Sequence, residues 1–472
     1  MPRSAIRNLC ALSIPVFIVL NACGDDSSAE VPQEGPAPAP PSYAVVIPPY
    51  EQPKGDPAEG YRYLVNGEYV RTGPALDAFR DSGRPLEPRD TVPGREPQNA
   101  GLGYLFTAAT ADDGQRVAAP NCLACHASHL QGKLIIGLGR ANHFVKTDST
   151  GASVDVTSIV RADSSGLDNG LDFFVRLFRG ALQGNHMNVF AELASHHDPK
   201  TLVWSDQSSF DSNSHLQGWV DFPPWWCTKK KNALYFNGTG RGVKAHHLQL
   251  MSFFSVASVE EASKIEQGFV HVNAWLDTLE APKFPGEIDR GLATRGKNVF
   301  LKTCATCHGT YGETDAEDTY PNLLIPVSDV GTDPNLATNH WMYPAIDWYK
   351  ESWYARNNDS SFERVNGYMA PPLDGIWATA PYFHNGSVPT LDAVIDPAKR
   401  PAIWTTDNSE DDYDLERVGW KDKPGEVQVL TLDFSFGRYD TSKSGYSNQG
   451  HVYGAALSAG DQRALLEYLK TL

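Results

Sequence analysis

The sequence is short of positive charge, of cysteine and of long apolar runs, and each shortage excludes a class of protein. Its 472 residues include 40 Lys and Arg against 57 Asp and Glu, a formal net charge of −17. An acidic surface of this kind argues against nucleic acid or an anionic membrane face as a partner. After residue 22, no run reaches the roughly 18 continuous apolar residues that a membrane-spanning helix needs, so no transmembrane span is expected. With 41% hydrophobic residues, the chain still has enough apolar material for more than one core.

Only seven cysteines occur, and four of them belong to two copies of one short pattern. Residues 122–126 and 304–308 both read C-x-x-C-H, the attachment signature of c-type haem. Each thiol adds to a vinyl group of the haem, and the histidine that follows ligates the iron. A redox disulfide or half of a zinc site would also use paired cysteines, but neither explains why a histidine follows both times. The sequence therefore predicts two covalently bound haems, attached through Cys122, Cys125, Cys304 and Cys307, with iron bound by His126 and His308.

The first 50 residues have the composition of an export signal followed by a tether. Residues 1–22 place Arg3 and Arg7 before an apolar run, which predicts a lipoprotein-type signal peptide. The segment ends Leu-Asn-Ala before Cys23 and resembles a bacterial lipobox, so Cys23 is expected to carry lipid. An ordinary cleaved leader is the alternative. The Pro-rich residues 23–50 predict a flexible tether. We therefore expect an exported protein, periplasmic or at the cell surface, that meets a bacterial membrane only through its N-terminal lipid.

Apolar residues recur at helical spacing in three segments. These are residues 266–279, 290–300 and 458–472, and in the last of them Ser458 is a plausible N-cap with Asp461 three residues on. In cytochrome c folds a C-terminal helix crosses the helix that precedes the haem motif. Residues 290–300 and 458–472 have the right places in the chain for that pair.

We therefore predict a mainly α protein with two cytochrome c-like domains, in which long irregular loops wrap the haems. Residues 95–283 would form the first domain and residues 284–472 the second. Residues 51–94 would be an N-terminal extension packed on them. The segments between the helices are rich in Gly, Pro, Asn and Asp, as expected where a cofactor supplies part of the core.

The sixth ligand of each iron decides what the protein does. An iron with two strong protein ligands transfers electrons, whereas an open distal face binds oxygen or peroxide. For the first haem, His143 ends a Gly-containing loop that could return over the distal face, and the alternative is an open or weakly occupied site. Other histidines near this motif are expected to be structural or exposed: His129, His186, His196, His197, His246 and His247.

A longer pattern in the second half resembles a known group of proteins. Residues 369–389 read Met-Ala-Pro-Pro-Leu-Asp-Gly-Ile-Trp-Ala-Thr-Ala-Pro-Tyr-Phe-His-Asn-Gly-Ser-Val-Pro. Together with residues 221–235 and 448–454, this segment resembles the bacterial dihaem cytochrome c peroxidase superfamily. It is closest in motif to the dihaem rubber-oxygenase-like c-type cytochromes. The resemblance spans roughly residues 100–472 and implies that the 369–389 segment lies over the C-terminal haem.

The resemblance also bears on the sixth ligand of the second haem. In typical peroxidases of the superfamily, the residue before the histidine of His-Asn-Gly is a methionine that ligates iron. Phe383 stands at that place here and cannot ligate. In the rubber oxygenases the second histidine of the C-terminal haem lies near the chain end, which implies His451. His384 and Met369 are the alternatives, and His384 could instead be a hydrogen-bond donor to a haem propionate.

These features predict an exported dihaem oxidoreductase that is peroxidase- or oxygenase-like. The first haem would react with peroxide or oxygen, and the second would transfer electrons. Its partners would be a redox protein or a small-molecule oxidant or substrate. The alternative is a membrane-anchored dihaem electron-transfer cytochrome without substrate chemistry of its own.

The stretch between the two motifs holds further candidates. Trp225 and Trp226 could couple two haems electronically, and the basic run 229–231 could pair with haem propionates. The alternative is a set of core aromatics beside a solvated turn. Cys227 is expected to be a small buried hydrophobe rather than a reactive thiol. Spacing does not single out a catalytic acid among Asp172, Glu192 and Asp221.

Overall fold

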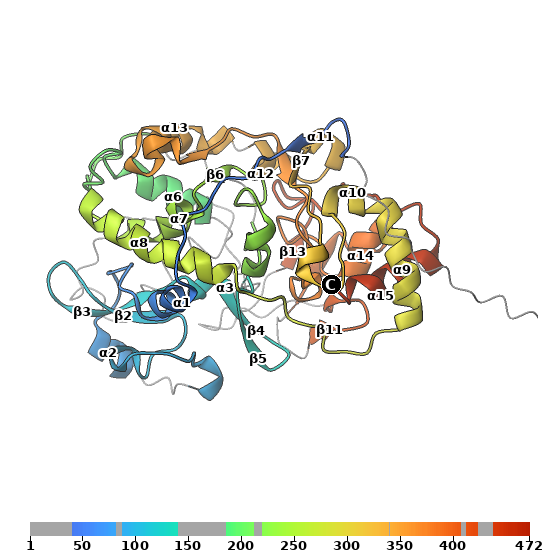
Figure 1. Cartoon of the computed structure of the whole chain (residues 1–472), viewed down its shortest axis with the longest axis horizontal. Coiled ribbons are helices and arrows are strands. Elements are labelled where there is room, and N and C mark those ends of the chain that lie inside the picture. The colour runs from blue at the N-terminus through green and yellow to red at the C-terminus, as the bar shows by residue number, and fades with distance from the viewer. Residues whose placement is uncertain are drawn as a thin grey trace, which may run out of the picture. The chain divides into compact units, whose positions relative to one another are not determined.

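A pair of crossing helices organises the C-terminal part of the chain (Figure 1). In this computed structural model, α9 (Arg290–Thr303) ends directly before the second motif and packs on α15 (Ala459–Leu469). The approach is close at Gly296, where a Cβ would lie 1.9 Å from the carbonyl oxygen of Ala464. Ser458 caps α15, because its hydroxyl oxygen accepts from the amide of Asp461 at 3.1 Å. Both predicted helices and the predicted cap are confirmed.

The structure describes residues 40–81, 87–139, 186–211, 220–338, 340–406, 412–422 and 438–472. All of them belong to one compact unit, Ala37–Leu472. The predicted signal peptide, the lipidation site Cys23, His143 and Asp172 lie outside the described residues. Residues 23–39 of the predicted tether also lie outside the described residues.

A second helix pair organises the N-terminal part. The helix α8 (Val259–Leu276) begins earlier than the predicted segment 266–279 and packs on α1 (Pro57–Asn66). Small residues again permit the contact, since a Cβ on Gly60 would lie 2.0 Å from the carbonyl oxygen of His271. The sequence did not indicate this pair. Its helix α1 comes from the segment 51–94, far upstream of the first motif (Figure 1).

The first motif lies between two hairpins rather than after a helix. Antiparallel strands β2 (Phe106–Thr110) and β3 (Arg116–Pro120) precede it, and β4 (Ala127–Leu130) with β5 (Lys133–Ile136) follow it. Only the short helix α3 (Leu123–His126) separates the hairpins. The fold is therefore mixed, although mostly helical, and the two motifs have different surroundings.

The remaining elements are short. A three-stranded antiparallel sheet has the order β1-β7-β9, and two-stranded antiparallel pairs join β6 to β8, β10 to β13 and β11 to β12. The strands are β1 (Val45–Val46), β6 (Gly240–Gly242), β7 (Leu323–Pro326), β8 (Ser360–Phe362), β9 (Gly367–Met369), β10 (Ile403–Thr405), β11 (Tyr413–Asp414), β12 (Gly419–Trp420) and β13 (Arg438–Asp440). The other α-helices among the described residues are α2 (Leu76–Asp81), α6 (His186–Ser195), α7 (Lys244–Leu248), α10 (Ala305–His308), α11 (Val327–Val330), α12 (Pro334–Thr338), α13 (Tyr343–Glu351) and α14 (Leu391–Ile395). None of the helices within the described ranges has the length and apolar character to cross a bilayer.

Two large hydrophobic clusters fill the interior. The first gathers side chains between Leu64 and Leu276, together with residues 342–362 from the predicted second domain. The second gathers Phe300 and most apolar side chains from 373 to 469, together with Trp226 and Cys227 from the predicted first domain. The division into domains at residues 283 and 284 stays a prediction. These two exchanges show that each core draws on both halves of the sequence.

Candidate functional site

The two C-x-x-C-H motifs have the same local structure. In each, the carbonyl oxygen of the first cysteine accepts hydrogen bonds from the amides of the second cysteine and the histidine. The distances are 3.3 and 3.1 Å at Cys122 and 3.1 and 3.0 Å at Cys304. Residues at i, i+3 and i+4 of a helical turn share one face. The spacing of the motif therefore presents both thiols and the imidazole on the same side, as attachment of one planar group requires.

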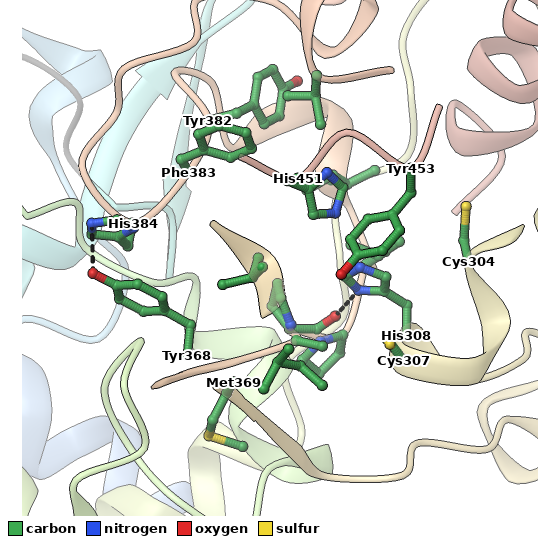
Figure 2. Close-up of a pocket in the computed structure, with 18 of the residues that line it drawn as sticks. Cys304, Cys307, His308, Tyr368, Met369, Tyr382, Phe383, His384, His451 and Tyr453 are labelled. Carbon is green, nitrogen blue, oxygen red and sulfur yellow. Dashed lines mark hydrogen bonds between the residues drawn. The ribbon is translucent and has the colours of Figure 1, made fainter. Parts of the chain in front are cut away.

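A cavity of about 430 Å³ opens beside the second motif (Figure 2). Cys304, Cys307 and His308 form one wall, and Leu465 and Leu469 of α15 lie among the other lining residues. Cavities of a few hundred Å³ with mainly apolar walls are typical of cofactor sites. Both helices of the crossing pair therefore line this cavity, α9 through Phe300 and Thr303 and α15 through Leu465 and Leu469.

Two half-buried histidines share the cavity, His308 from the motif and His451 from the chain end. Their ring centroids lie 6.2 Å apart. An imidazole nitrogen lies about 1.1 Å from its ring centroid and binds a metal at about 2.0 Å, so two imidazoles on opposite sides of one metal have centroids about 6 Å apart. The observed separation fits one iron between them.

The protonation of both rings suits ligation. The Nδ1 of His308 lies 2.8 Å from the carbonyl oxygen of Pro371, which can only accept, so Nδ1 carries the proton and Nε2 keeps its lone pair. Burial lowers the pKa of His308. Burial lowers the pKa of His451 to about 3, and nearby His308 and Arg400 act in the same direction. Both imidazoles are therefore neutral near pH 7.

His384 lies elsewhere in the same cavity and is engaged with another side chain. Its Nε2 is 2.9 Å from the hydroxyl of Tyr368, and the two rings stack at 4.1 Å. Because the Tyr368 hydroxyl donates to the carbonyl oxygen of Asp333 at 2.5 Å, the shared proton with His384 must come from the imidazole. Figure 2 shows His384 beside Tyr368 and apart from His308. Met369 lines the cavity too, but packs in a small hydrophobic cluster with Ile47 and Ala233.

The basic run 229–231 places three lysines in three environments. Lys230 is held between Asp318 and Asp374, each at 2.5 Å, and Lys229 lies 3.5 Å from Glu280. Lys231 is only 7% exposed and lines the cavity, and no described carboxylate pairs with it. Burial lowers its pKa to about 8.

A buried cation without an anion is costly unless a ligand supplies one. The two propionates of a haem would do so. The thiol pair, the facing imidazoles and this lysine are therefore a set of groups that fits a c-type haem.

The first motif is built against aromatic side chains. The ring of His126 stacks on Trp225 at 4.5 Å with an interplanar angle of 19°, and its edge meets Phe222 at 5.6 Å. The amide of Cys122 donates to the hydroxyl of Tyr69 at 3.2 Å. The candidate sixth ligand His143 is not among the described residues.

Trp225 and Trp226 belong to different cores. Trp225 packs in the first cluster against His126, whereas Trp226 packs in the second. The indole nitrogen of Trp226 donates to the carbonyl oxygen of Asp374 at 2.7 Å. Asp374 lies close in sequence to Pro371, whose carbonyl oxygen accepts the hydrogen bond from His308 Nδ1. Two adjacent residues therefore contact the surroundings of both motifs. Their neighbour Cys227 is buried, as predicted.

Several other candidates have local partners. A ring nitrogen lies within hydrogen-bond distance of a described atom in each of five histidines: His129, His196, His197, His246 and His247. Asp221 lines the cavity, accepts from the amide of Phe222 at 2.8 Å, and has its pKa raised well above the usual range by burial. Glu192 lies 3.4 Å from His196. These contacts do not identify a catalytic acid.

The second half of the chain matches two family models. Residues 293–378 match the cytochrome c model, and residues 367–405 match a model described as RoxA-like, cytochrome c-like. The first match contains Cys304, Cys307 and His308, so at least one c-type haem is implied. Cytochrome c domains are typically extracytoplasmic. The second match agrees in part with the resemblance found in residues 369–389.

Two proteins of Sinorhizobium fredii (strain NBRC 101917 / NGR234) are similar to longer parts of the chain. The uncharacterized protein y4iJ is 31% identical over 288 residues, which are 47% of this chain and 46% of y4iJ. The uncharacterized protein y4iM is 28% identical over 320 residues, which are 56% of this chain and 68% of y4iM. The similarity thus spans less than half of the length of y4iJ.

Proposed function

We propose that the protein is an exported dihaem c-type cytochrome oxidoreductase, peroxidase- or oxygenase-like. The second haem transfers electrons, and the first reacts with peroxide or oxygen. The observation that carries the electron-transfer assignment is the pair His308 and His451, whose rings lie 6.2 Å apart in the cavity beside Cys304 and Cys307.

At the second site the roles follow from the donor set. Cys304 and Cys307 would hold the haem covalently, and His308 and His451 would bind its iron. Haem iron with two protein ligands supplies electron transfer rather than substrate binding. Lys231 supplies the counter-charge for a propionate. The carbonyl oxygen of Pro371 orients His308 by holding its Nδ1 proton at 2.8 Å.

At the first site, Cys122 and Cys125 would hold the haem, and His126 would bind its iron. The reactive role rests on the motif resemblance and on the different surroundings of this motif, which is flanked by hairpins. His143 is the candidate for its sixth ligand, and an open position is the other possibility. The proposed electron path between the sites runs through two adjacent tryptophans. Trp225 stacks on His126, and Trp226 is hydrogen-bonded to the carbonyl oxygen of Asp374.

The alternative is a membrane-anchored dihaem electron-transfer cytochrome without substrate chemistry. The His308 and His451 pair favours electron transfer at the second site in either case, so the first site decides. Lipidation at Cys23 and export by residues 1–22 belong to both proposals.

The deciding experiment uses the full-length protein matured with its haems. Intact mass should show two added haems, and EPR of the oxidised protein should show one low-spin and one high-spin centre. Cyanide or peroxide should change only the high-spin signal. Two low-spin centres whose EPR signals change with neither cyanide nor peroxide would favour the electron carrier. A mass without added haem would contradict both proposals.

A matched variant assigns the signals. In His126→Ala the high-spin centre should change its spectrum, while the low-spin centre keeps its own. Loss of both signals together would argue against two separate haem sites.

A further inference from the structure

The side chain of Arg400, which follows α14, binds the segment that ends at His451. One terminal nitrogen, Nη1, donates to the carbonyl oxygens of Asn448 at 2.8 Å and Gly450 at 2.7 Å. The other, Nη2, donates to the carbonyl oxygen of His451 itself at 3.0 Å. One guanidinium therefore holds three carbonyls of a single turn.

The same guanidinium is tied to α14 at its other side. Its Nε donates to the carbonyl oxygen of Ala393 at 3.0 Å, and Nη2 also donates to that of Val394 at 3.2 Å. The planar fork of an arginine can bridge two segments in this way, which the single ammonium of a lysine cannot. The link is built almost wholly on backbone carbonyls, so it fixes main-chain position rather than a charge pair.

The backbone conformation at His451 is unfavourable for a residue that carries a side chain. His451 has a φ of +46°, in the left-handed region, and Gly450 has a φ of +78°. Gly450 packs so closely on Gly331 that a Cβ would lie 2.2 Å from the Gly331 carbonyl carbon. The amide of His451 donates to the carbonyl oxygen of Val330 at 2.7 Å. A histidine in this conformation persists only where neighbouring contacts hold it.

Arg400 also contacts Phe383, the residue directly before His384. Its guanidinium lies 5.0 Å from the centre of the Phe383 ring. The same ring lies 5.8 Å from that of His451. The Phe383 ring therefore lies in contact with both the His451 imidazole and the Arg400 guanidinium.

We infer that Arg400 is the positioning residue for the sixth ligand of the second haem. It holds the 448–451 turn so that His451 faces His308, in place of a ligand at position 383. The inference rests on the proposed ligation by His308 and His451. It predicts that loss of Arg400 frees the imidazole without removing any ligand.

The test compares Arg400→Met and Arg400→Lys with the parent, as full-length holoprotein. In Arg400→Met we expect the high-spin EPR signal to grow by about one spin per molecule, because the second haem loses its sixth ligand. Added imidazole should return that spin to the low-spin form. Arg400→Lys should keep a larger low-spin share, since a lysine restores part of the hydrogen bonding. Should Arg400→Met not fold, a smaller growth of the high-spin signal, again reversed by imidazole, is expected in Arg400→Lys.

The matched control is Arg295→Met. Arg295 lies in the same half of the chain and pairs with Asp461 on an exposed helix face. It should leave the spin count unchanged. A merely structural Arg400 would lower the melting temperature and leave the second haem low-spin and unresponsive to imidazole, and that result would overturn the inference.

His451→Ala separates this inference from the proposed function. If His451→Ala becomes high-spin and the Arg400 variants do not, only the positioning role is wrong. If His451→Ala itself stays low-spin, the proposed ligation is wrong and the inference falls with it.

Discussion

His384 and Tyr368 form a stacked, hydrogen-bonded pair within the cavity, with ring centroids 4.1 Å apart and Nε2 2.9 Å from the hydroxyl oxygen. A histidine most often binds iron through Nε2, and in His384 this nitrogen is already engaged in the hydrogen bond with Tyr368. By contrast, the His451 ring is not hydrogen-bonded to a described side chain, and its buried Nδ1 has no partner. This difference makes the two candidate ligands experimentally separable.

We predict that His451→Ala converts the second haem from low-spin to high-spin and lets it bind added imidazole. His384→Ala should leave the spin state unchanged, because His384 is a wall residue bonded to Tyr368. Visible and EPR spectra of the oxidised proteins measure both outcomes. A low-spin His451→Ala together with a high-spin His384→Ala would reverse the assignment.

The charge on Lys231 should tune the second haem. Lys231→Met leaves a propionate without its counter-ion and favours the oxidised iron, so the midpoint potential should fall, by on the order of 50 mV. Redox titration followed at the second haem's absorbance measures the shift. The control is Lys229→Met, since Lys229 pairs with the exposed Glu280 and lies outside the cavity lining. Equal shifts in the two variants would show that Lys231 has no special place.

The crossing of α9 and α15 gives a paired prediction within one helix. Gly296→Ala places a Cβ 1.9 Å from the carbonyl oxygen of Ala464 and should lower the free energy of unfolding by about 1–3 kcal/mol. Gly291→Ala lies at an exposed position in the first turn of the same helix, where the nearest atom to the new Cβ is Asp289 Oδ1 at 3.3 Å, so it should change the free energy of unfolding by less than about 1 kcal/mol. Thermal or denaturant unfolding of the two variants checks the difference in size.

A buried histidine in the first core should make the protein sensitive to acid. Burial lowers the pKa of His247 to about 4 from its usual value of 6.5. Between these values the unfolded chain binds the proton and the folded protein does not, so stability falls as pH is lowered from about 6.5 to 4. The loss attributable to this group reaches about 3 kcal/mol at pH 4.

The variant that tests this is His247→Gln, which can still donate to the carbonyl oxygen that His247 meets at 2.9 Å. Its stability should depend less on pH across that range than the parent's does. His340→Gln, at an exposed position, should leave the slope unchanged. Parallel slopes for all three proteins would show that His247 does not carry the effect.

Local signals were enough for part of the fold. Helical periodicity before the second motif and at the chain end predicted α9 and α15, and the hydroxyl of Ser458 made its cap predictable too. These elements depend on residues close together in the sequence. The hairpins around the first motif have no comparable signal, because all four strands are short, and β2, β3 and β4 are largely buried, which removes the alternation of a half-exposed strand.

Long-range exchanges were not predictable from one sequence. Residues 342–362 pack with the first cluster, and Trp226 packs with the second. Each of these segments is apolar enough to join either cluster, so composition alone does not predict which cluster it joins. The contact of α1 with α8 depends likewise on Gly60 meeting His271, which no local pattern reveals.

The sequence by itself predicted where the haems attach, because one helical turn brings the two thiols and the histidine of each motif to a common face. Only the tertiary structure decided which distant imidazole faces His308. Residues 369, 384 and 451 all reach the same cavity, and the choice depends on contacts that join segments far apart in the chain. Tyr368 engages His384, while Val330 and Arg400 hold the turn of His451.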